Sequence, residues 1–148
     1  MTPNQQLFVR VALAFALAYV IGFEREVRGS PAGDRTFSLV GTGAAAITAV
    51  TVTHGPQAIA GVVTGIGFIG AGVVFQDSGA TVRGLTTAAS VFATAALGVV
   101  VGTGHLLLGV VVAGAVLLSL ELRNIPGLGR LDARTYEGRF RGDDERRR

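Results

Sequence analysis

The stretch Leu7–Phe23, LFVRVALAFALAYVIGF, decides the fold class. Its only charged residue is Arg10, which lies close enough to one end to reach the membrane interface. A bilayer core about 30 Å thick is crossed by roughly 20 apolar residues in a helix. A cleaved signal peptide would end in small residues, whereas this stretch ends in Phe23-Glu24-Arg25. The sequence therefore predicts a transmembrane helix here.

Four further stretches have the same apolar character. They run near residues 36–53, 58–75, 85–102 and 106–120, with short connections between them. Charged residues make up only 16% of the chain, against about 25% in soluble domains. We therefore predict an all-α membrane protein, a bundle of five transmembrane helices with short loops. Residues 1–120 form its membrane domain, and residues 121–148 form a charged tail.

The arginines lie almost entirely on one side of this predicted bundle. Five spans place the N-terminus and the turns at 54–57 and 102–105 on one side, with one Arg. The loops at 24–35 and 76–84 and the tail lie on the other side, with twelve. Because positive residues accumulate on the cytoplasmic side, we expect the N-terminus outside and the C-terminus in the cytoplasm.

We expect the predicted helices to associate through small residues. Lipid tails are as apolar as the helices, so burying apolar side chains does not favour helix association in a membrane. The glycines that we interpret as packing residues are Gly61, Gly65, Gly67, Gly70, Gly72, Gly98 and Gly102. Four of them crowd residues 65–72, so local unwinding that exposes carbonyls to an ion is the alternative there. Residues 65–70 also match G-x-G-x-x-G in form, but no βαβ unit surrounds them, which argues against a nucleotide site.

The two charged loops carry acids and bases in equal number. We expect an ion-pair network made of Glu24, Arg25, Arg28, Asp34, Arg35, Asp77 and Arg83. Glu24 and Arg28 are four residues apart and would pair on a helix. Weak candidates for a Mg²⁺ site are Glu24, Glu26 and Asp77, since Mg²⁺ takes one or two carboxylates and keeps its waters. The nearby arginines would oppose a metal, so we favour the network; isolated caps and interface anchors are the plainer alternative.

Catalytic chemistry has no evident place in this sequence. The chain has no Cys, which excludes disulfides and thiolate chemistry. Both His residues fall at the predicted outer helix ends, while nearly all acids fall inside, so no Ser–His–acid set shares one side. No carboxylate lies near the middle of a span, where ion-coupled transporters usually have one. We predict a protein that is not an enzyme, with no cofactor, no catalytic residues and no nucleic-acid partner.

Two motifs resemble signatures of the MgtC/SapB family of bacterial membrane proteins. Residues 24–36, EREVRGSPAGDRT, resemble the family's E-R-E-x-R-G-x-P-A-G-L-R-T loop. The glycine run at 65–72, followed at 81–90 by TVRGLTTAAS, resembles its second signature. The resemblance covers residues 7–120. Asp34 departs from it, since the family usually has an apolar residue there, and residues 57–61, QAIAG, lack the Arg and Gln pair that is common just before the glycine run.

The resemblance implies a multi-pass protein of the bacterial inner membrane, linked to growth at low magnesium and to virulence through survival inside host cells. It also implies a short member without the soluble C-terminal domain of longer ones. Some members look like regulators of other membrane proteins, including the membrane sector of F-type ATP synthase. We therefore expect a regulator that docks on other membrane proteins, with self-association as a further option. The alternative is a transporter or channel for Mg²⁺ or another small ion, using the glycine-rich third span.

Overall fold

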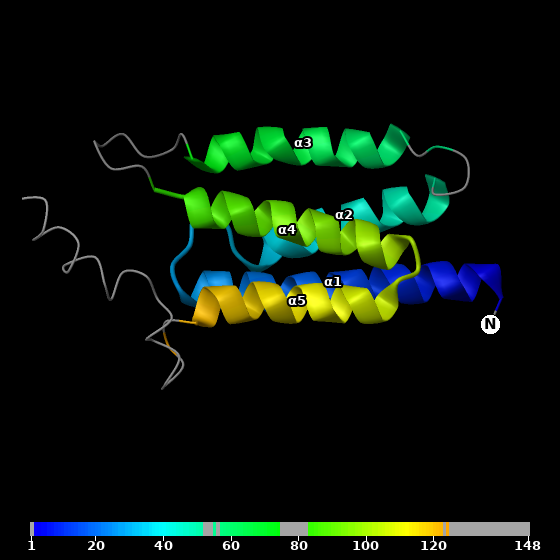
Figure 1. Cartoon of the computed structure of the whole chain (residues 1–148), viewed down its shortest axis with the longest axis horizontal. Coiled ribbons are helices and arrows are strands. Elements are labelled where there is room, and N and C mark those ends of the chain that lie inside the picture. Colours follow the sequence, from blue (N-terminus) through cyan, green and yellow to red (C-terminus); the bar gives the residue numbers. More distant parts are fainter. Residues whose placement is uncertain (1, 52–54, 56, 75–82, 123, 125–148) are drawn as a thin grey trace, which may run out of the picture. The chain divides into compact units, whose positions relative to one another are not determined.

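The computed structural model describes residues 2–51, 55, 57–74, 83–122 and 124, which form five α-helices (Figure 1). In chain order they are α1 (Pro3–Val27), α2 (Asp34–Thr51), α3 (Gln57–Val74), α4 (Leu85–Gly102) and α5 (Leu106–Glu121). Each helix overlaps one of the predicted stretches. The all-helical architecture with five helices is therefore confirmed.

The first helix extends beyond its apolar stretch because both of its ends are capped. Thr2 and Gln5 form a capping box, and Pro3 takes the first helical position. At the other end, Gly29 adopts a left-handed φ of +67°, and the Ser30 N–H donates to the carbonyl of Arg25 at 3.0 Å. This C-terminal motif turns the chain sharply and brings Ser30 back beside the helix end.

Three helices, α1, α3 and α4, are long and apolar enough to cross a membrane by length and composition. The fifth is a shorter apolar helix. The second has a charged first turn, which holds Asp34 and Arg35. Several apolar helices in one short chain indicate a multi-pass membrane protein.

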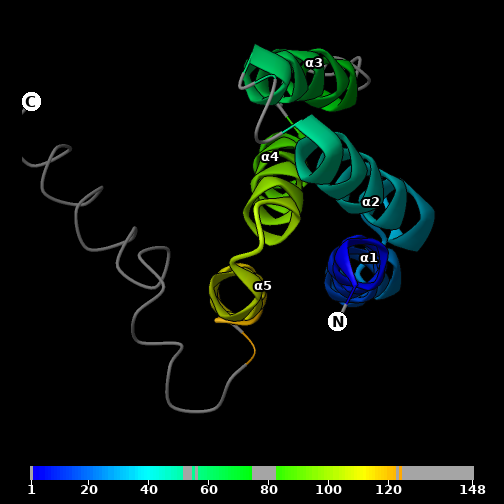
Figure 2. The same cartoon turned by 90° about the vertical axis from the view of Figure 1, so that its right-hand side faces the viewer.

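Residues Met1–Val116 form one compact unit. Within it, α2 packs against both α1 and α4, and α1 also contacts α4 (Figure 2). The third helix lies against α4, with a smaller contact to α2, on the side away from α1. The second unit, Leu117–Arg148, is described only at the end of α5 and just beyond it, where Asn124 Nδ2 donates to Glu121 Oε2 at 2.9 Å.

Glycines bring the backbones of α2 and α4 into direct contact. A Cβ atom at Gly98 would lie 2.5 Å from the carbonyl oxygen of Gly41, and one at Gly102 would lie 2.7 Å from that of Ala45. On the other face of α2, a Cβ at Gly41 itself would lie 2.5 Å from the Ala18 Cβ of α1. Since no Cβ fits at these positions, glycine sets the spacing of α1, α2 and α4.

Hydroxyl side chains occupy much of the remaining core. The buried polar residues of the described chain are Ser38, Thr48, Thr87, Ser90 and Thr94. Several donate to the carbonyl four residues earlier, as Ser90 does to Thr86 at 2.6 Å. Such back-bonding lets polar side chains pack in an apolar environment without an unmet donor.

Arg10 contacts the end of a neighbouring helix. Its Nη1 donates to the Gly102 carbonyl at 3.1 Å, at the C-terminal end of α4. The turn after α4 leaves room for the guanidinium at Gly104, where φ is +97° and a Cβ would lie 2.9 Å from Nη2. A cation is stabilised at a helix C-terminus because the last carbonyls there are unpaired and carry partial negative charge.

Candidate functional site

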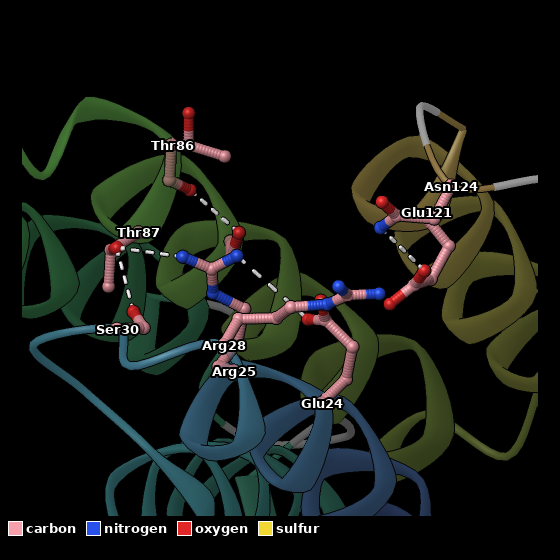
Figure 3. A network of polar contacts seen from close by, with 9 residues as sticks. Glu24, Arg25, Arg28, Ser30, Thr86, Thr87, Glu121 and Asn124 are labelled. Atoms are coloured by element: carbon pink, nitrogen blue, oxygen red, sulfur yellow. Dashed lines mark hydrogen bonds and ion pairs between the residues drawn. The ribbon is translucent and has the colours of Figure 1, made fainter. Parts of the chain in front are cut away.

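Polar side chains gather where α1 ends and α4 begins (Figure 3). Arg25 Nη2 donates to Thr87 Oγ1 at 3.3 Å, and the hydroxyl oxygens of Thr87 and Ser30 are 2.9 Å apart. The Glu24 carboxylate lies 3.9 Å from Arg25 Nη1 and 3.6 Å from Arg28 Nε. We call these five residues, Glu24, Arg25, Arg28, Ser30 and Thr87, the α1–α4 polar cluster.

Two charged side chains of this cluster are largely buried. The side chains of Glu24 and Arg25 are 12% and 14% exposed, whereas that of Arg28 is 45% exposed. Ionised groups are buried only at a large desolvation cost, which paired partners offset. The contact between Arg25 and Thr87 joins the end of α1 to the third residue of α4, across 62 positions of sequence. The cluster therefore ties the end of α1 and the first charged loop to the start of α4.

The other charged residues of the first loop lie outside the cluster. The Glu26 carboxylate contacts Gly33, whose lack of a Cβ makes room for it. The Asp34 carboxylate accepts a hydrogen bond from the Arg35 backbone N–H at 2.6 Å. The Arg35 side chain is exposed and forms no ion pair within the described part of the chain.

Of the seven residues predicted to form a network, the structure brings together Glu24, Arg25 and Arg28. Arg83 is exposed, just before α4 begins, and Asp77 lies outside the described residues. The network as a whole therefore stays a prediction. Ser30 and Thr87 are not among the seven predicted residues, because neutral hydroxyl residues carry no charge signal. Their presence in two motifs of one family is the only hint that they meet.

The metal candidates can be located only in part. Glu24 is engaged by two arginines, and Glu26 lies against Gly33. Among the residues that the structure describes, no group of three or more His, Asp and Glu side chains could hold a metal ion. The third candidate, Asp77, lies outside those residues, so the metal site also stays a prediction.

The third helix lies at one edge of the bundle (Figure 2), and most of its residues are exposed. It is a continuous α-helix over Gln57–Val74, which differs from the unwound alternative. Ile66 is its one buried residue among those described, and a Cβ at Gly70 would meet Ala88 of α4 at 3.7 Å. Cβ atoms at the other predicted packing glycines of this helix would meet nothing within 4 Å; these are Gly61, Gly65, Gly67 and Gly72.

Three of these glycines share one side of α3 with a large aromatic ring. Gly61, Gly65 and Gly72 fall on the same helical face as Phe68, whose side chain is 84% exposed. We call these four residues the glycine face of α3. Each glycine weakens a helix by about 1 kcal/mol relative to Ala. At Gly98 and Gly102, close contact with α2 requires glycine and so explains why this cost is tolerated. No contact among the described residues explains it on the glycine face.

Apolar helices held together by glycine contacts, with a partly buried polar cluster at their ends, define a multi-pass helical membrane protein. Comparison of sequences places it more narrowly: the chain belongs to the MgtC family, whose model matches residues 11–125. The resemblance found in the two motifs is thereby confirmed.

Individual relatives match most of this chain. It is 39% identical over 133 residues to Protein SrpB of Synechococcus elongatus, covering 78% of this chain and 73% of that protein. It is 46% identical over 99 residues to Protein MgtC of Brucella abortus, covering 64% and 41% respectively. Identity to the putative magnesium transporter YhiD of Escherichia coli is 40% over 130 residues, covering 79% and 60%. No solved structure matches.

Proposed function

We propose that this chain is a non-enzymatic regulator in the bacterial inner membrane that docks on another membrane protein through the glycine face of α3. One observation carries the proposal. Cβ atoms at Gly61, Gly65 and Gly72 would meet nothing within 4 Å among the described residues, so packing within that part of the chain does not explain these helix-weakening glycines. In lipid, glycines let a partner helix approach closely, and the exposed Phe68 adds contact area between them.

The process we assign to it is growth at low magnesium, including growth of pathogens inside host cells. Support comes from the relative named a putative magnesium transporter and from family membership. The matched relatives are longer than the matched region, since the alignments cover 41% to 73% of them. The membrane sector of F-type ATP synthase is one partner that the family resemblance offers, and a second copy of this chain is another.

The proposal includes a topology in which all five helices span the membrane, with the N-terminus outside and the tail in the cytoplasm. The one-to-twelve distribution of Arg supports it. A reporter that works only in the cytoplasm should be active when fused after Arg148 and silent when inserted at Gly55. The opposite pattern would overturn the topology.

Transport of Mg²⁺ or another small ion is the alternative function. The name of the E. coli relative favours it. Two observations weigh against it: α3 is a continuous helix, whereas transporter ion sites typically use broken helices, and no carboxylate lies at mid-span. Docking therefore has the stronger support.

A photo-crosslinking amino acid at position 68 tests docking directly in cells. We expect a crosslink to one defined membrane protein, which Gly61→Leu and Gly65→Leu abolish. Gly114→Leu on α5 is the matched control, because a Cβ there also meets nothing within 4 Å. Equal loss in the control, or no crosslink at position 68, would contradict the docking face.

Purified protein in liposomes that contain a Mg²⁺-sensitive dye separates the two functions. The docking proposal expects no protein-dependent influx. Influx that Gly70→Leu abolishes would establish transport instead, since Gly70 is the α3 glycine that faces α4.

A further inference from the structure

One side of α1 carries a row of exposed aromatic side chains. They recur at intervals of seven and four residues, which places them on a single face of the helix. The buried residues of α1, such as Ala14 and Ala18, lie on the opposite face, where the helix packs against its neighbours. Two exposed alanines lie among the rings. We call this surface the aromatic face of α1; its residues are Phe8, Ala12, Phe15, Ala16, Tyr19 and Phe23.

Three of these rings are stacked on one another. The ring centroids of Phe15 and Tyr19 are 6.1 Å apart, and those of Tyr19 and Phe23 are 6.4 Å apart, with interplanar angles of 22° and 30°. The three side chains are between 41% and 54% exposed. Because each ring restricts its neighbour, a partner that covers this face immobilises little that is not already ordered.

Tyr19 lies deep within the apolar stretch of α1. It is four residues, or about 6 Å, from Phe23 at one end of that stretch and twelve residues, or about 18 Å, from Leu7 at the other. Side chains on a helix lean toward its N-terminus, so the hydroxyl is directed away from the nearer end. Tyr residues that face lipid favour the membrane interface, where the hydroxyl meets water. A lipid-facing Tyr at this depth is therefore unusual.

The Tyr19 hydroxyl has no hydrogen-bond partner within the described part of the chain. Thr side chains on a helix surface donate to their own helix, as Thr64 does to the Ala60 carbonyl at 2.9 Å. The phenol ring holds the Tyr hydroxyl too far from its own backbone for such a bond. Since hydrocarbon offers no acceptor, the partner of this hydroxyl has to come from another polypeptide.

We propose that a second copy of this chain covers the aromatic face of α1, in a dimer whose twofold axis runs along the membrane normal. Copies inserted in the same direction then have parallel α1 helices, and their Tyr19 residues lie at the same depth. A Tyr hydroxyl both donates and accepts, so the two hydroxyls satisfy each other across the axis. Ala12 and Ala16 leave room for the rings of the second copy. Close packing and interhelical hydrogen bonds are the interactions that hold helices together in lipid.

The aromatic face is a different surface from the glycine face of α3. It belongs to α1, which packs on α2 and α4, whereas the glycine face belongs to α3, which packs mainly on α4. A dimer through α1 therefore leaves the glycine face free for another membrane protein. The two proposals fail or hold separately.

Disulfide crosslinking of the full-length protein in liposomes tests the dimer. The chain contains no Cys, so a single introduced thiol reports only its own neighbours. Ala12→Cys places a thiol on the aromatic face without removing a ring. Ala96→Cys is the matched control, because Ala96 is also an exposed alanine on a helix long enough to span the membrane. Each variant is oxidised with copper phenanthroline at decreasing protein-to-lipid ratios.

We expect Ala12→Cys to form covalent dimers at ratios where Ala96→Cys shows none. Adding Tyr19→Phe to Ala12→Cys keeps the ring but removes the hydroxyl, and should raise the protein-to-lipid ratio at half-maximal crosslinking about threefold, since an interhelical hydrogen bond contributes modestly. Ala16→Cys repeats the measurement at a second position on the same face if Ala12→Cys does not fold.

Three results would overturn the proposal. Equal crosslinking at positions 12 and 96 would mean that lipid covers the aromatic face. An unchanged ratio with Tyr19→Phe would remove the hydroxyl pair on which the dimer rests. Loss of crosslinking at position 12 on adding Gly65→Leu would place the contact between copies on α3 instead, whereas the α1 dimer expects that substitution to have no effect.

Discussion

One methyl group at Gly98 tests whether glycine sets the spacing of α2 and α4. In Gly98→Ala, the new Cβ would lie 2.5 Å from the Gly41 carbonyl oxygen, 2.8 Å from the Ala44 Cβ and 3.2 Å from the Ala45 nitrogen. Two of these three neighbours are backbone atoms, which cannot move aside as a flexible side chain can. Overpacking of this kind costs about 1–3 kcal/mol, and we expect the upper part of that range.

The gain in helix propensity from Gly to Ala, about 1 kcal/mol, partly hides this cost. Gly65→Ala is the matched variant, because a Cβ there meets nothing within 4 Å and only the propensity gain applies. The difference between the two variants therefore isolates the packing contribution. We expect Gly65→Ala to stabilise the protein slightly and Gly98→Ala to be about 2–3 kcal/mol less stable than Gly65→Ala.

The assay is reversible unfolding in mixed detergent micelles, followed by circular dichroism, with the free energy of unfolding fitted for each variant. Equal free energies for the two variants would refute the reasoning, because they would mean that α2 and α4 separate at no cost. A destabilised Gly65→Ala would show instead that the glycine face of α3 is packed in the micelle.

Further outcomes follow from single contacts. Arg10→Leu removes the charged donor to Gly102 and should lower the free energy of unfolding by about 1.5–3 kcal/mol in the same assay, while Arg35→Leu, at an exposed site, should change it by less than about 0.5 kcal/mol. Thr87→Val leaves the buried Arg25 without its one hydrogen bond and should cost about 1–3 kcal/mol, whereas a cost near zero would mean that water replaces the hydroxyl. Gly29→Ala should cost about 1 kcal/mol from the left-handed φ of +67° alone, since a Cβ there meets nothing within 4 Å; an unchanged melting temperature would contradict the C-terminal motif of α1.

The sequence alone determined the five helices and the family. Hydrophobic length is a local property, so stretches such as 85–102 and 106–120 were placed within a residue or two of α4 and α5. The error was largest at α1, which extends four residues further at each end, because capping by Thr2 and the Gly29 turn lies outside the apolar stretch. The ion pair between Glu24 and Arg28 could also be predicted from the sequence, since residues four apart lie together on a helix.

Only the tertiary structure decided which glycines pack inside the protein. Gly61/Gly65 and Gly98/Gly102 have identical spacing, yet the second pair contacts the α2 backbone and the first meets nothing. The spacing of the glycines determines which face of a helix carries small residues. Which element packs against that face depends on how all the helices assemble. The hydrogen bond from Arg25 to Thr87, across 62 residues, also depends on how the helices assemble. No local pattern encodes it, because it exists only once α1 and α4 lie side by side.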